Sequence, residues 1–260
     1  MSQQFMTIKT FGLTSRARLQ YVLENESPRG LVLDVGCGGG EATVSLRMRG
    51  FEVVGLDKDV AQLESLSALR NMGEGYHLVV ADASRLPFRG ASFGTIYCME
   101  VINMLESDEE ALIELVRVLE RNGACTISVP NADYPLIYDP LNKFLERMGL
   151  GHRLIGIWSP GVKRLYRSTD LLLRLRRLGL SPIRLDFVGK WLIPVLENYL
   201  LLLLYYNVLA AKFRMRFTFK GEGMAPGKFS AISKLLDNIV RLDSIPNLRG
   251  THFIVKCVKS

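Results

Sequence analysis

Residues 31–40 read Leu-Val-Leu-Asp-Val-Gly-Cys-Gly-Gly-Gly, and this stretch decides the fold. Its apolar run is typical of a buried strand, and it leads through an acid into a glycine-rich turn. Gly36, Gly38 and Gly40 let the backbone turn sharply and approach a ligand closely, because a Cβ at these positions would collide with that ligand. We therefore predict that the turn begins a sheet that binds a nucleoside.

The main competing interpretation is a nicotinamide or flavin dinucleotide site. Its fingerprint requires a third glycine three residues after the second, at the start of the crossover helix, where this chain has Glu41. An acid there would oppose the negative charge of the pyrophosphate at the helix N-terminus. Asp34 argues the same way, because a carboxylate at a strand end suits a cationic ligand better than a diphosphate.

Acids also follow the next two predicted strands. Phe51–Leu56 ends in Asp57, and Tyr76–Ala81 ends in Asp82, which begins a turn. A fourth strand is expected within residues 92–101, Ser-Phe-Gly-Thr-Ile-Tyr-Cys-Met-Glu-Val. Open α/β sheets bind their ligands at the carboxyl ends of the strands, so we expect these positions to meet at one edge of the sheet.

The pattern of residues 34–40 closely resembles motif I of the S-adenosylmethionine-dependent methyltransferases with a Rossmann-like fold, and the resemblance covers residues 28–130 and 166–188. It implies that S-adenosylmethionine is the cofactor. It further implies that Asp57 accepts both ribose hydroxyls, that Asp82 accepts from the adenine amino group, that the Ala83 amide faces the ring, and that the fourth strand ends by the methionine part. The cofactor-binding residues expected from it are Asp34, Gly36, Cys37, Gly38, Gly40, Asp57, Lys58, Asp82, Ala83 and Cys98.

Each of these features also has a purely structural interpretation. A lone glycine turn serves ordinary packing between a strand and a helix. Asp57 and Asp59 are equally suited to capping the following helix, and Asp82 is suited to stabilising a turn. Their joint position at the ends of consecutive strands favours the cofactor interpretation.

Helix and strand signals alternate along the chain, which predicts an α/β fold with a parallel sheet and helices on both faces. Ser107 and Glu110 predict a capping box, and Ser168-Thr169-Asp170 predicts the cap of a later helix. The expected helices are 14–23, 41–49, 60–72, 108–121 and 171–178, and the expected later strands are 124–129, 183–188 and 251–258. The helix at 14–23 is suited either to covering the cofactor as a lid or to packing against the sheet edge.

In the resembled fold, a seven-stranded Rossmann-like sheet, the last strand enters antiparallel after a short hairpin. Residues 189–250 are far too long for a hairpin loop, so we expect a helical insertion before the last strand. We predict a single methyltransferase domain over 1–260. Its parts are a cofactor-binding core at 28–130, a substrate-side insertion at 131–167, and an apolar, basic helical insertion at 190–249.

Cysteines and histidines give no sign of a disulfide or a metal site. Cys37, Cys98, Cys125 and Cys257 have no CxxC spacing and are expected to be reduced core residues, and the three histidines are widely separated. Residues 1–12 contain no continuous apolar run, so we expect no secretory signal and a cytoplasmic protein.

Charge divides the chain into two halves. Residues 1–130 carry 12 Lys and Arg against 17 Asp and Glu, whereas residues 131–260 carry 21 against 9. The second half is therefore suited to an anionic surface or substrate, although a charge excess also serves solvation alone. Nucleic acid is the less favoured partner, because the apolar insertion places leucines where a nucleic-acid groove would alternate cations with stacking aromatics.

Residues 191–211 form a long apolar segment with flanking cations. Three interpretations remain open: a helix in the membrane interface, a buried core or dimer contact, and a membrane span. Glu197 and Pro194 disfavour the span, because a carboxylate near the middle of a bilayer is costly and proline breaks a helix. We expect peripheral membrane contact through residues 190–216 if the interfacial interpretation is right.

The leading functional hypothesis is methyl transfer from S-adenosylmethionine to a small hydrophobic or anionic acceptor such as a lipid or a quinone. The sulfonium already activates the methyl group, so the protein mainly aligns the reactants and excludes water. The catalytic residue is unknown, with Asp133, Tyr134, Tyr138 and Asp139 as weak candidates for a base. The alternative is a noncatalytic protein that keeps the cofactor fold and docks on a membrane or a protein partner.

Overall fold

A computed structural model describes residues 12–66, 76–134, 162–197, 226–243 and 248–260. The chain divides into two compact units, which we call the small unit and the large unit. The small unit comprises Met1–Ala17, Tyr134–Gly161 and Val188–Thr251, and the large unit comprises Arg18–Asp133, Val162–Phe187 and His252–Ser260.

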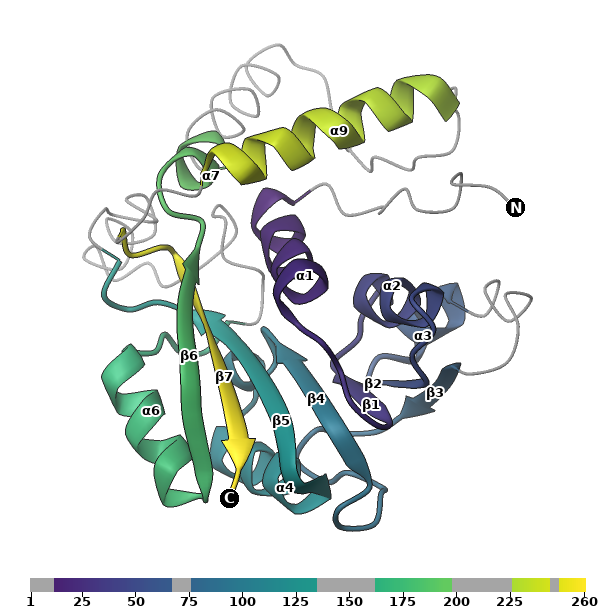
Figure 1. Ribbon diagram of the computed structural model, residues 1–260, viewed down its shortest axis with the longest axis vertical. Coiled ribbons are helices and arrows are strands. Elements are labelled where there is room, and N and C mark those ends of the chain that lie inside the picture. Colours follow the sequence, from purple (N-terminus) through teal and green to yellow (C-terminus); the bar gives the residue numbers. More distant parts are fainter. Residues whose placement is uncertain (1–11, 67–75, 135–161, 198–225, 244–247) are drawn as a thin grey trace. The chain divides into compact units, whose positions relative to one another are not determined.

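The large unit contains a seven-stranded sheet in the order β3-β2-β1-β4-β5-β7-β6 (Figure 1). The strands β1 to β5 are parallel, and β7 is antiparallel to β5. Their bounds are β1 Val32–Val35, β2 Val53–Asp57, β3 Tyr76–Val80, β4 Phe93–Met99, β5 Leu119–Pro130, β6 Leu180–Val188 and β7 His252–Lys259. The strand order reverses between β1 and β4, and such a switch point is where open α/β sheets bind ligands. The predicted Rossmann-like fold is confirmed.

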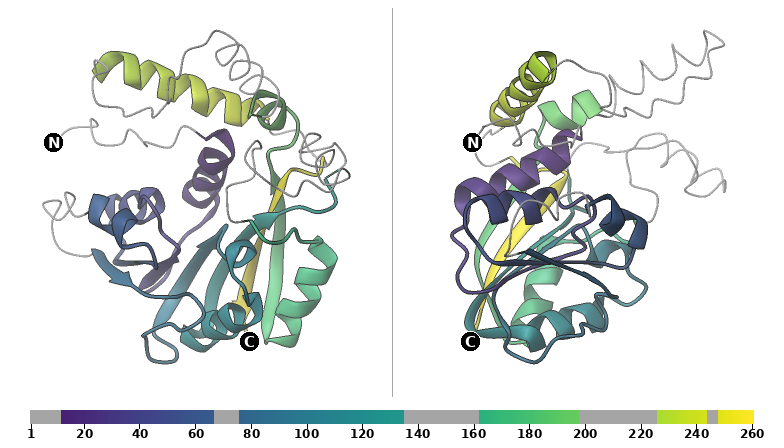
Figure 2. Two further views of the ribbon diagram at one scale, coloured as in Figure 1. Left: turned by 180° about the vertical axis from the view of Figure 1, so that it is seen from behind. Right: turned by 90° about the vertical axis from the view of Figure 1, so that its right-hand side faces the viewer.

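Helices cover both faces of this sheet. Figure 2 shows α2 (Glu41–Met48) and α3 (Val60–Ser65) on one face, with α4 (Asp108–Val118) and α6 (Ser168–Arg177) on the other. The central strands are consequently buried on both sides, and all four residues of β1 are buried. Leu112 and Leu115 lie about one turn apart on α4, and both are buried in the same core.

The helix α1 (Leu13–Asn25) agrees with the helix predicted at 14–23, and it begins in the small unit and ends in the large one. In the large unit the Tyr21 hydroxyl donates to Asp186 of β6 at 2.7 Å. The guanidinium of Arg184, also on β6, lies 5.4 Å from the Tyr21 ring centroid. In the order of the sheet, β6 is an edge strand. This part of α1 therefore packs against the sheet edge, which was one of the two predicted alternatives.

Several predicted boundaries were wrong. The helix expected to reach Arg121 ends at Val118, because Leu119 already pairs with Phe93 of β4 and starts β5. Gly123 therefore lies inside a strand instead of ending a helix. β6 begins at Leu180, three residues earlier than expected. Residues 67–72 of the helix predicted at 60–72 lie outside the described residues.

Both predicted side-chain caps were also wrong. Ser107 occupies the N-cap position of α4 but makes no side-chain cap hydrogen bond. The acids of the first turn, among them Asp108, complement the helix dipole there instead. Ser168, Thr169 and Asp170 lie inside α6, whose N-cap residue is Arg167.

The small unit has its own apolar cluster. Leu13, Ala17 and Ile193 are buried, and side chains of α9 (Pro226–Leu242) pack against them. Ile193 belongs to the short helix α7 (Leu192–Val195). The predicted insertion before the last strand thus contains helices.

Carboxylates fix the helix ends of the small unit. Asp243 is 3% exposed and accepts from the backbone amides of residues 190, 191, 192 and 193 at 2.6–3.1 Å. Glu197 accepts from the Thr14 amide at 2.9 Å and from its hydroxyl at 2.6 Å, near the start of α1. Glu197, the acid that disfavours a membrane span, therefore accepts hydrogen bonds at the start of α1.

The apolar segment 191–211 is described only as far as Glu197. Within the described part of the chain, no helix has the length and apolar character needed to cross a membrane. The choice between an interfacial helix and a core or dimer contact falls on residues outside that part and stays open.

Candidate functional site

The glycine turn after β1 has the left-handed backbone that its composition predicts. The φ angles are +67° at Gly36, +49° at Gly38 and +73° at Gly40. A Cβ at Gly36 would lie 2.3 Å from Val101, and one at Gly40 would lie 2.6 Å from Leu66, whereas one at Gly38 would meet nothing within 4 Å. Protein packing therefore already excludes a side chain at Gly36 and Gly40, and the close approach of a ligand to these glycines stays a prediction. Only Gly38 opens onto free space.

Asp57 ends β2 with its carboxylate held toward this turn. The Gly38 amide donates to Oδ2 at 2.9 Å, and the Asp59 amide donates to Oδ1 at 2.9 Å. Asp59 is the residue that caps α3, through a bond from the Ala61 amide at 3.0 Å. Of the two acids suited to capping this helix, Asp59 is thus the one that caps it. Each Asp57 oxygen accepts one amide hydrogen bond and retains capacity for another.

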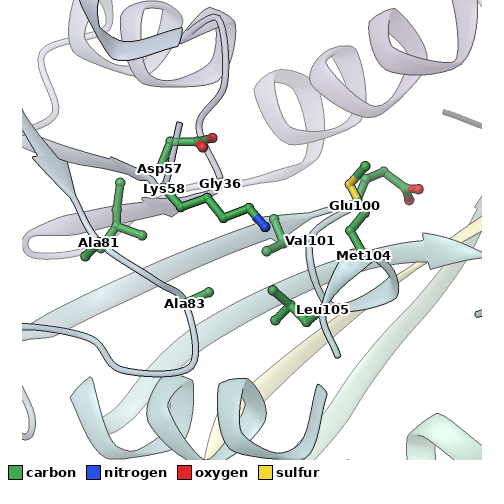
Figure 3. A pocket seen from close by; sticks show the side chains of 10 residues that line it. Gly36, Asp57, Lys58, Ala81, Ala83, Glu100, Val101, Met104 and Leu105 are labelled. Atoms are coloured by element: carbon green, nitrogen blue, oxygen red, sulfur yellow. The ribbon is translucent and has the colours of Figure 1, made fainter. Parts of the chain in front are cut away.

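A cavity lies beside Asp57 at the carboxyl ends of the parallel strands (Figure 3). Its walls are mostly apolar, with Asp57 and Glu100 as the acids and Lys58 as the cation. The lining residues are Gly36, Leu56, Asp57, Lys58, Ala81, Ala83, Glu100, Val101, Met104 and Leu105. The cavity therefore occupies the switch point between β1 and β4.

Four of the predicted cofactor-binding residues line this cavity, namely Gly36, Asp57, Lys58 and Ala83. The others, Asp34, Cys37, Gly38, Gly40, Asp82 and Cys98, do not belong to its lining. Gly38 takes part through its hydrogen bond to Asp57. Cys37 and Cys98 are buried, and burial raises the pKa of both thiols. All four cysteines are free and buried, which confirms the predicted reduced core residues.

Asp34 points into the protein. The residue is 3% exposed, and its Oδ2 accepts from the Thr43 hydroxyl of α2 at 2.6 Å. Burial raises the pKa of Asp34 to about 6, and the hydrogen bond from Thr43 offsets only part of this effect. Its carboxyl group thus joins β1 to α2.

Asp82 stabilises its own turn. Oδ1 accepts from the Ser84 amide at 2.8 Å and from the Ser84 hydroxyl at 2.7 Å. These hydrogen bonds hold the pKa of Asp82 below its ordinary value, with a smaller contribution from nearby Lys58. These contacts agree with the structural interpretation of Asp82, in which its side chain stabilises a turn.

Four residues that follow β4 also line the cavity, and none of them was predicted as a site residue: Glu100, Val101, Met104 and Leu105. Glu100 is the informative one, because it is a non-glycine residue with a φ of +62°. An acid directly after the fourth strand was the available signal, of the same kind that identified Asp57. No pattern in the sequence marked Met104 or Leu105.

Glu100 is bound on several sides. Its Oε1 accepts from the Ser128 hydroxyl at 2.8 Å, and its Oε2 accepts from the Asn103 side chain at 3.3 Å. The Nε2 atom of His252 lies 3.4 Å from Oε2. Burial disfavours the charged form, but His252, Arg18 and the hydrogen bonds outweigh it and place the pKa of Glu100 below its ordinary value.

The weak candidates for a base are not part of the cavity lining. Asp133 lies 3.5 Å from the Arg167 guanidinium, and the Tyr134 hydroxyl donates to the Lys190 carbonyl at 3.0 Å. Tyr138 and Asp139 fall outside the described residues. Among the residues that the structure describes, no group of three His, Cys, Asp or Glu side chains is arranged to hold a metal ion.

Comparison with known proteins shows what this region is similar to. Residues 33–127 match the family described as a methyltransferase domain. A ubiquinone biosynthesis O-methyltransferase of Rickettsia canadensis (strain McKiel) is 28% identical over 121 residues, which are 44% of this chain and 51% of that protein. The chain thus spans about half the length of this curated relative.

Solved structures agree over nearly the whole chain. A SAM-dependent methyltransferase from Archaeoglobus fulgidus has a TM-score of 0.58 at 15% identity, covering 97% of this chain and 96% of its own. The [4+2]-cyclase SpnF has a TM-score of 0.57 at 17% identity, covering 95% and 81%. At these identities the similarity shows the fold, and a cyclase among the similar structures illustrates that one fold hosts more than one reaction.

Proposed function

We propose that the chain transfers a methyl group from S-adenosylmethionine to a small hydrophobic or anionic acceptor, and that residues 33–127, which match the methyltransferase domain, bind this cofactor. The observation that carries the proposal is the cavity at the switch point, with Asp57 on its wall and open space at Gly38. A ligand with a vicinal diol and an apolar ring suits this combination.

The residues on the cavity wall suit the parts of this cofactor. Asp57 has free acceptor capacity on both oxygens and is oriented by two backbone amides, as a ribose diol requires. Leu56, Ala81 and Val101 supply apolar surface for the adenine ring, and Ala83 follows at the end of β3. Lys58 reaches across the cavity from the Asp57 side (Figure 3) and suits a position along the bound cofactor.

The chemistry asks little of the protein beyond alignment. When bound, the cofactor supplies a methyl group that its sulfonium activates. The residues of the chain then hold the cofactor and the acceptor in line and exclude water from the apolar cavity. An acceptor with a hydroxyl group would also need to lose a proton, and Asp133 and Tyr134 stay untested candidates for that step.

The acceptor class is inferred from composition and from the relatives. Residues 131–260 carry 21 Lys and Arg against 9 Asp and Glu, which suits an anionic or lipid-like molecule. The relative that acts in ubiquinone biosynthesis adds support for a quinone-like acceptor. We place acceptor binding with the segments 131–167 and 190–249, and peripheral membrane contact with 190–216.

Calorimetric titration with S-adenosylmethionine and, separately, with NAD is the first test. Binding of S-adenosylmethionine alone supports the proposal, whereas binding of NAD alone overturns it. Incubation with quinone precursors and lipid extracts then tests turnover by the release of S-adenosylhomocysteine. Cofactor binding without turnover on any acceptor would favour the noncatalytic docking protein.

Sedimentation with vesicles tests the membrane contact. We expect the protein to sediment with anionic vesicles and to be released by salt, because its excess cations lie in the second half of the chain. Equal binding to neutral vesicles, or no binding to either, would contradict the electrostatic contact and leave the methyl transfer unaffected.

A further inference from the structure

Four large apolar side chains are exposed on two helices of the small unit. Trp191 at the N-cap of α7 and Val195 within it are 39% and 43% exposed, and Leu235 and Leu242 on α9 are 59% and 66% exposed. We call these four side chains the α7–α9 surface. Single exposed apolar residues are ordinary, whereas a group of them marks a surface suited to a partner.

The four side chains lie on neighbouring elements. α7 packs against α9, and Figure 1 shows it beside the C-terminal end of that helix. Asp243, which directly follows Leu242, accepts from the Trp191 amide at 2.9 Å, so the tryptophan and this leucine belong to the same end of α9. Leu235 lies about two turns before Leu242, on the same side of the helix. The exposed apolar side chains are therefore gathered in one part of the small unit.

Other residues of α9 attach the helix to the small unit. Leu236, Ile239 and Val240 pack against the buried apolar cluster of this unit, whereas Leu235 and Leu242 do not belong to the described part of that cluster. The two exposed leucines can therefore contact a partner while the helix keeps its packing.

Each exposed leucine of α9 directly follows an exposed cation, with Lys234 before Leu235 and Arg241 before Leu242. A lipid surface suits this arrangement, because the apolar side chains can enter the acyl boundary while the cations meet anionic headgroups. Tryptophan, present here as Trp191, is enriched at such interfaces. A nucleic acid would use the cations but offers no apolar surface to the leucines.

The acids of the small unit are bound by the chain itself. Its described residues include three acids. Glu197 accepts from Thr14, and Asp237 accepts from the buried guanidinium of Arg16 at 2.6 Å. Asp243 accepts from four backbone amides at α7. Lys234 and Arg241 are thus exposed beside the leucines, while these acids are engaged elsewhere in the unit.

We propose that the α7–α9 surface, together with Lys234 and Arg241, docks on an anionic lipid membrane. The proposal deepens the membrane contact placed with residues 190–216, because it assigns the insertion into lipid to two leucines of α9. It rests on the proposed function only for its purpose, which is to bring the protein to a lipid-like acceptor.

Vesicle sedimentation tests the surface, with phosphatidylcholine mixed with phosphatidylglycerol in one set and phosphatidylcholine alone in the other. Leu235→Ser combined with Leu242→Ser should weaken binding to the anionic vesicles by about tenfold or more. Lys234→Gln should weaken it by about fivefold, and only at low salt. Leu173→Ser is the matched control, because Leu173 lies on α6 of the large unit and is 53% exposed. This control should bind like wild type.

Several results would overturn the assignment. The double leucine variant would bind like wild type if the contact used other residues, and an equal loss in Leu173→Ser would show a nonspecific effect. Absence of wild-type binding also contradicts the proposal. A wild-type dimer that the double variant separates into monomers would assign the surface to a second copy of the chain. Circular dichroism excludes misfolding, and sedimentation needs no cofactor, so a failure of methyl transfer leaves this test unaffected.

Trp191 gives an independent readout. In Trp158→Phe it is the only tryptophan of the chain. Its emission should shift to shorter wavelength, and its quenching by iodide should fall, when anionic vesicles are added. Adding the two leucine substitutions to this background should abolish both changes. Unchanged emission from protein that sediments with the vesicles would contradict docking through this surface.

Discussion

The cavity wall of the large unit and the helix ends of the small unit use the same chemical group in opposite ways. Asp243 and Glu197 in the small unit accept hydrogen bonds from the chain itself, and Asp243 alone receives four backbone amides. Asp57 in the large unit receives one amide on each oxygen and keeps capacity toward the cavity. A carboxylate that the chain saturates is structural, and one that it orients but leaves partly free is suited to a ligand.

Removing the most saturated carboxylate should give the largest effect. In Asp243→Ala, the amides of residues 190–193 lose their common acceptor, and we expect about 3 kcal/mol of local stability to be lost. Amide hydrogen exchange of these residues measures the change. Asp170→Ala is the control, because Asp170 is exposed, and its effect should stay within about 0.5 kcal/mol. Unchanged amide exchange at these residues would contradict the structural role of Asp243.

The large unit also contains a carboxylate with a structural role, Asp108. Arg164 and Arg174 lie 2.7 and 2.8 Å from its oxygens, and the Tyr166 hydroxyl donates at 2.7 Å. Burial opposes ionisation, but these hydrogen bonds hold the pKa of Asp108 well below its ordinary value. Asp108→Asn should lower the free energy of unfolding by about 2 kcal/mol at neutral pH.

The sign of the pH dependence follows from that lowered pKa. The stabilisation by Asp108 is present above the pKa of the unfolded chain, about 3.9, and is lost as the pH falls toward the lower pKa of the folded protein. Denaturant unfolding at a series of pH values should show this loss in wild type. A loss of the same size in Asp108→Asn would contradict the assignment.

Asp57 should respond more strongly in ligand binding than in stability, because its carboxylate accepts two backbone amides and keeps capacity for a ligand. Asp57→Ala should weaken S-adenosylmethionine by at least about tenfold, or about 1.4 kcal/mol, because the ribose hydroxyls lose their acceptor. Titration calorimetry measures the affinity, and thermal unfolding without ligand serves as the control. Near wild-type affinity would remove Asp57 from the ligand-binding class.

Among these variants, a substitution at Gly38 should give the smallest effect on stability. Gly38→Ala meets no neighbour but adopts a φ of +49°, so we expect a loss of about 1 kcal/mol in stability together with weaker cofactor binding. Gly36→Ala should cost more stability, since its Cβ would lie 2.3 Å from Val101. Equal destabilisation of the two variants would contradict the division between a packed glycine and an open one.

Sequence patterns located the site but not the direction of its side chains. Asp57, the acid that ends β2, lines the cavity, whereas Asp34 in β1 points toward α2. The helix expected at 108–121 was too long, because strand pairing at Leu119 overrode local helical preference. The caps predicted at Ser107 and Ser168 failed for different reasons. Ser107 occupies the N-cap position without a side-chain cap hydrogen bond, and Ser168 is already the first residue of α6.

The sequence by itself determined the alternation of strands and helices, the glycine turn after β1, and the acids at the strand ends. These features are local, since they follow from periodicity, from the backbone freedom of glycine, and from the position of a polar residue after an apolar run. Only the tertiary structure decided that Asp34 is buried and that Glu100 lines the cavity. Central strands are buried on both faces, so their apolar pattern does not reveal which face a polar side chain will meet.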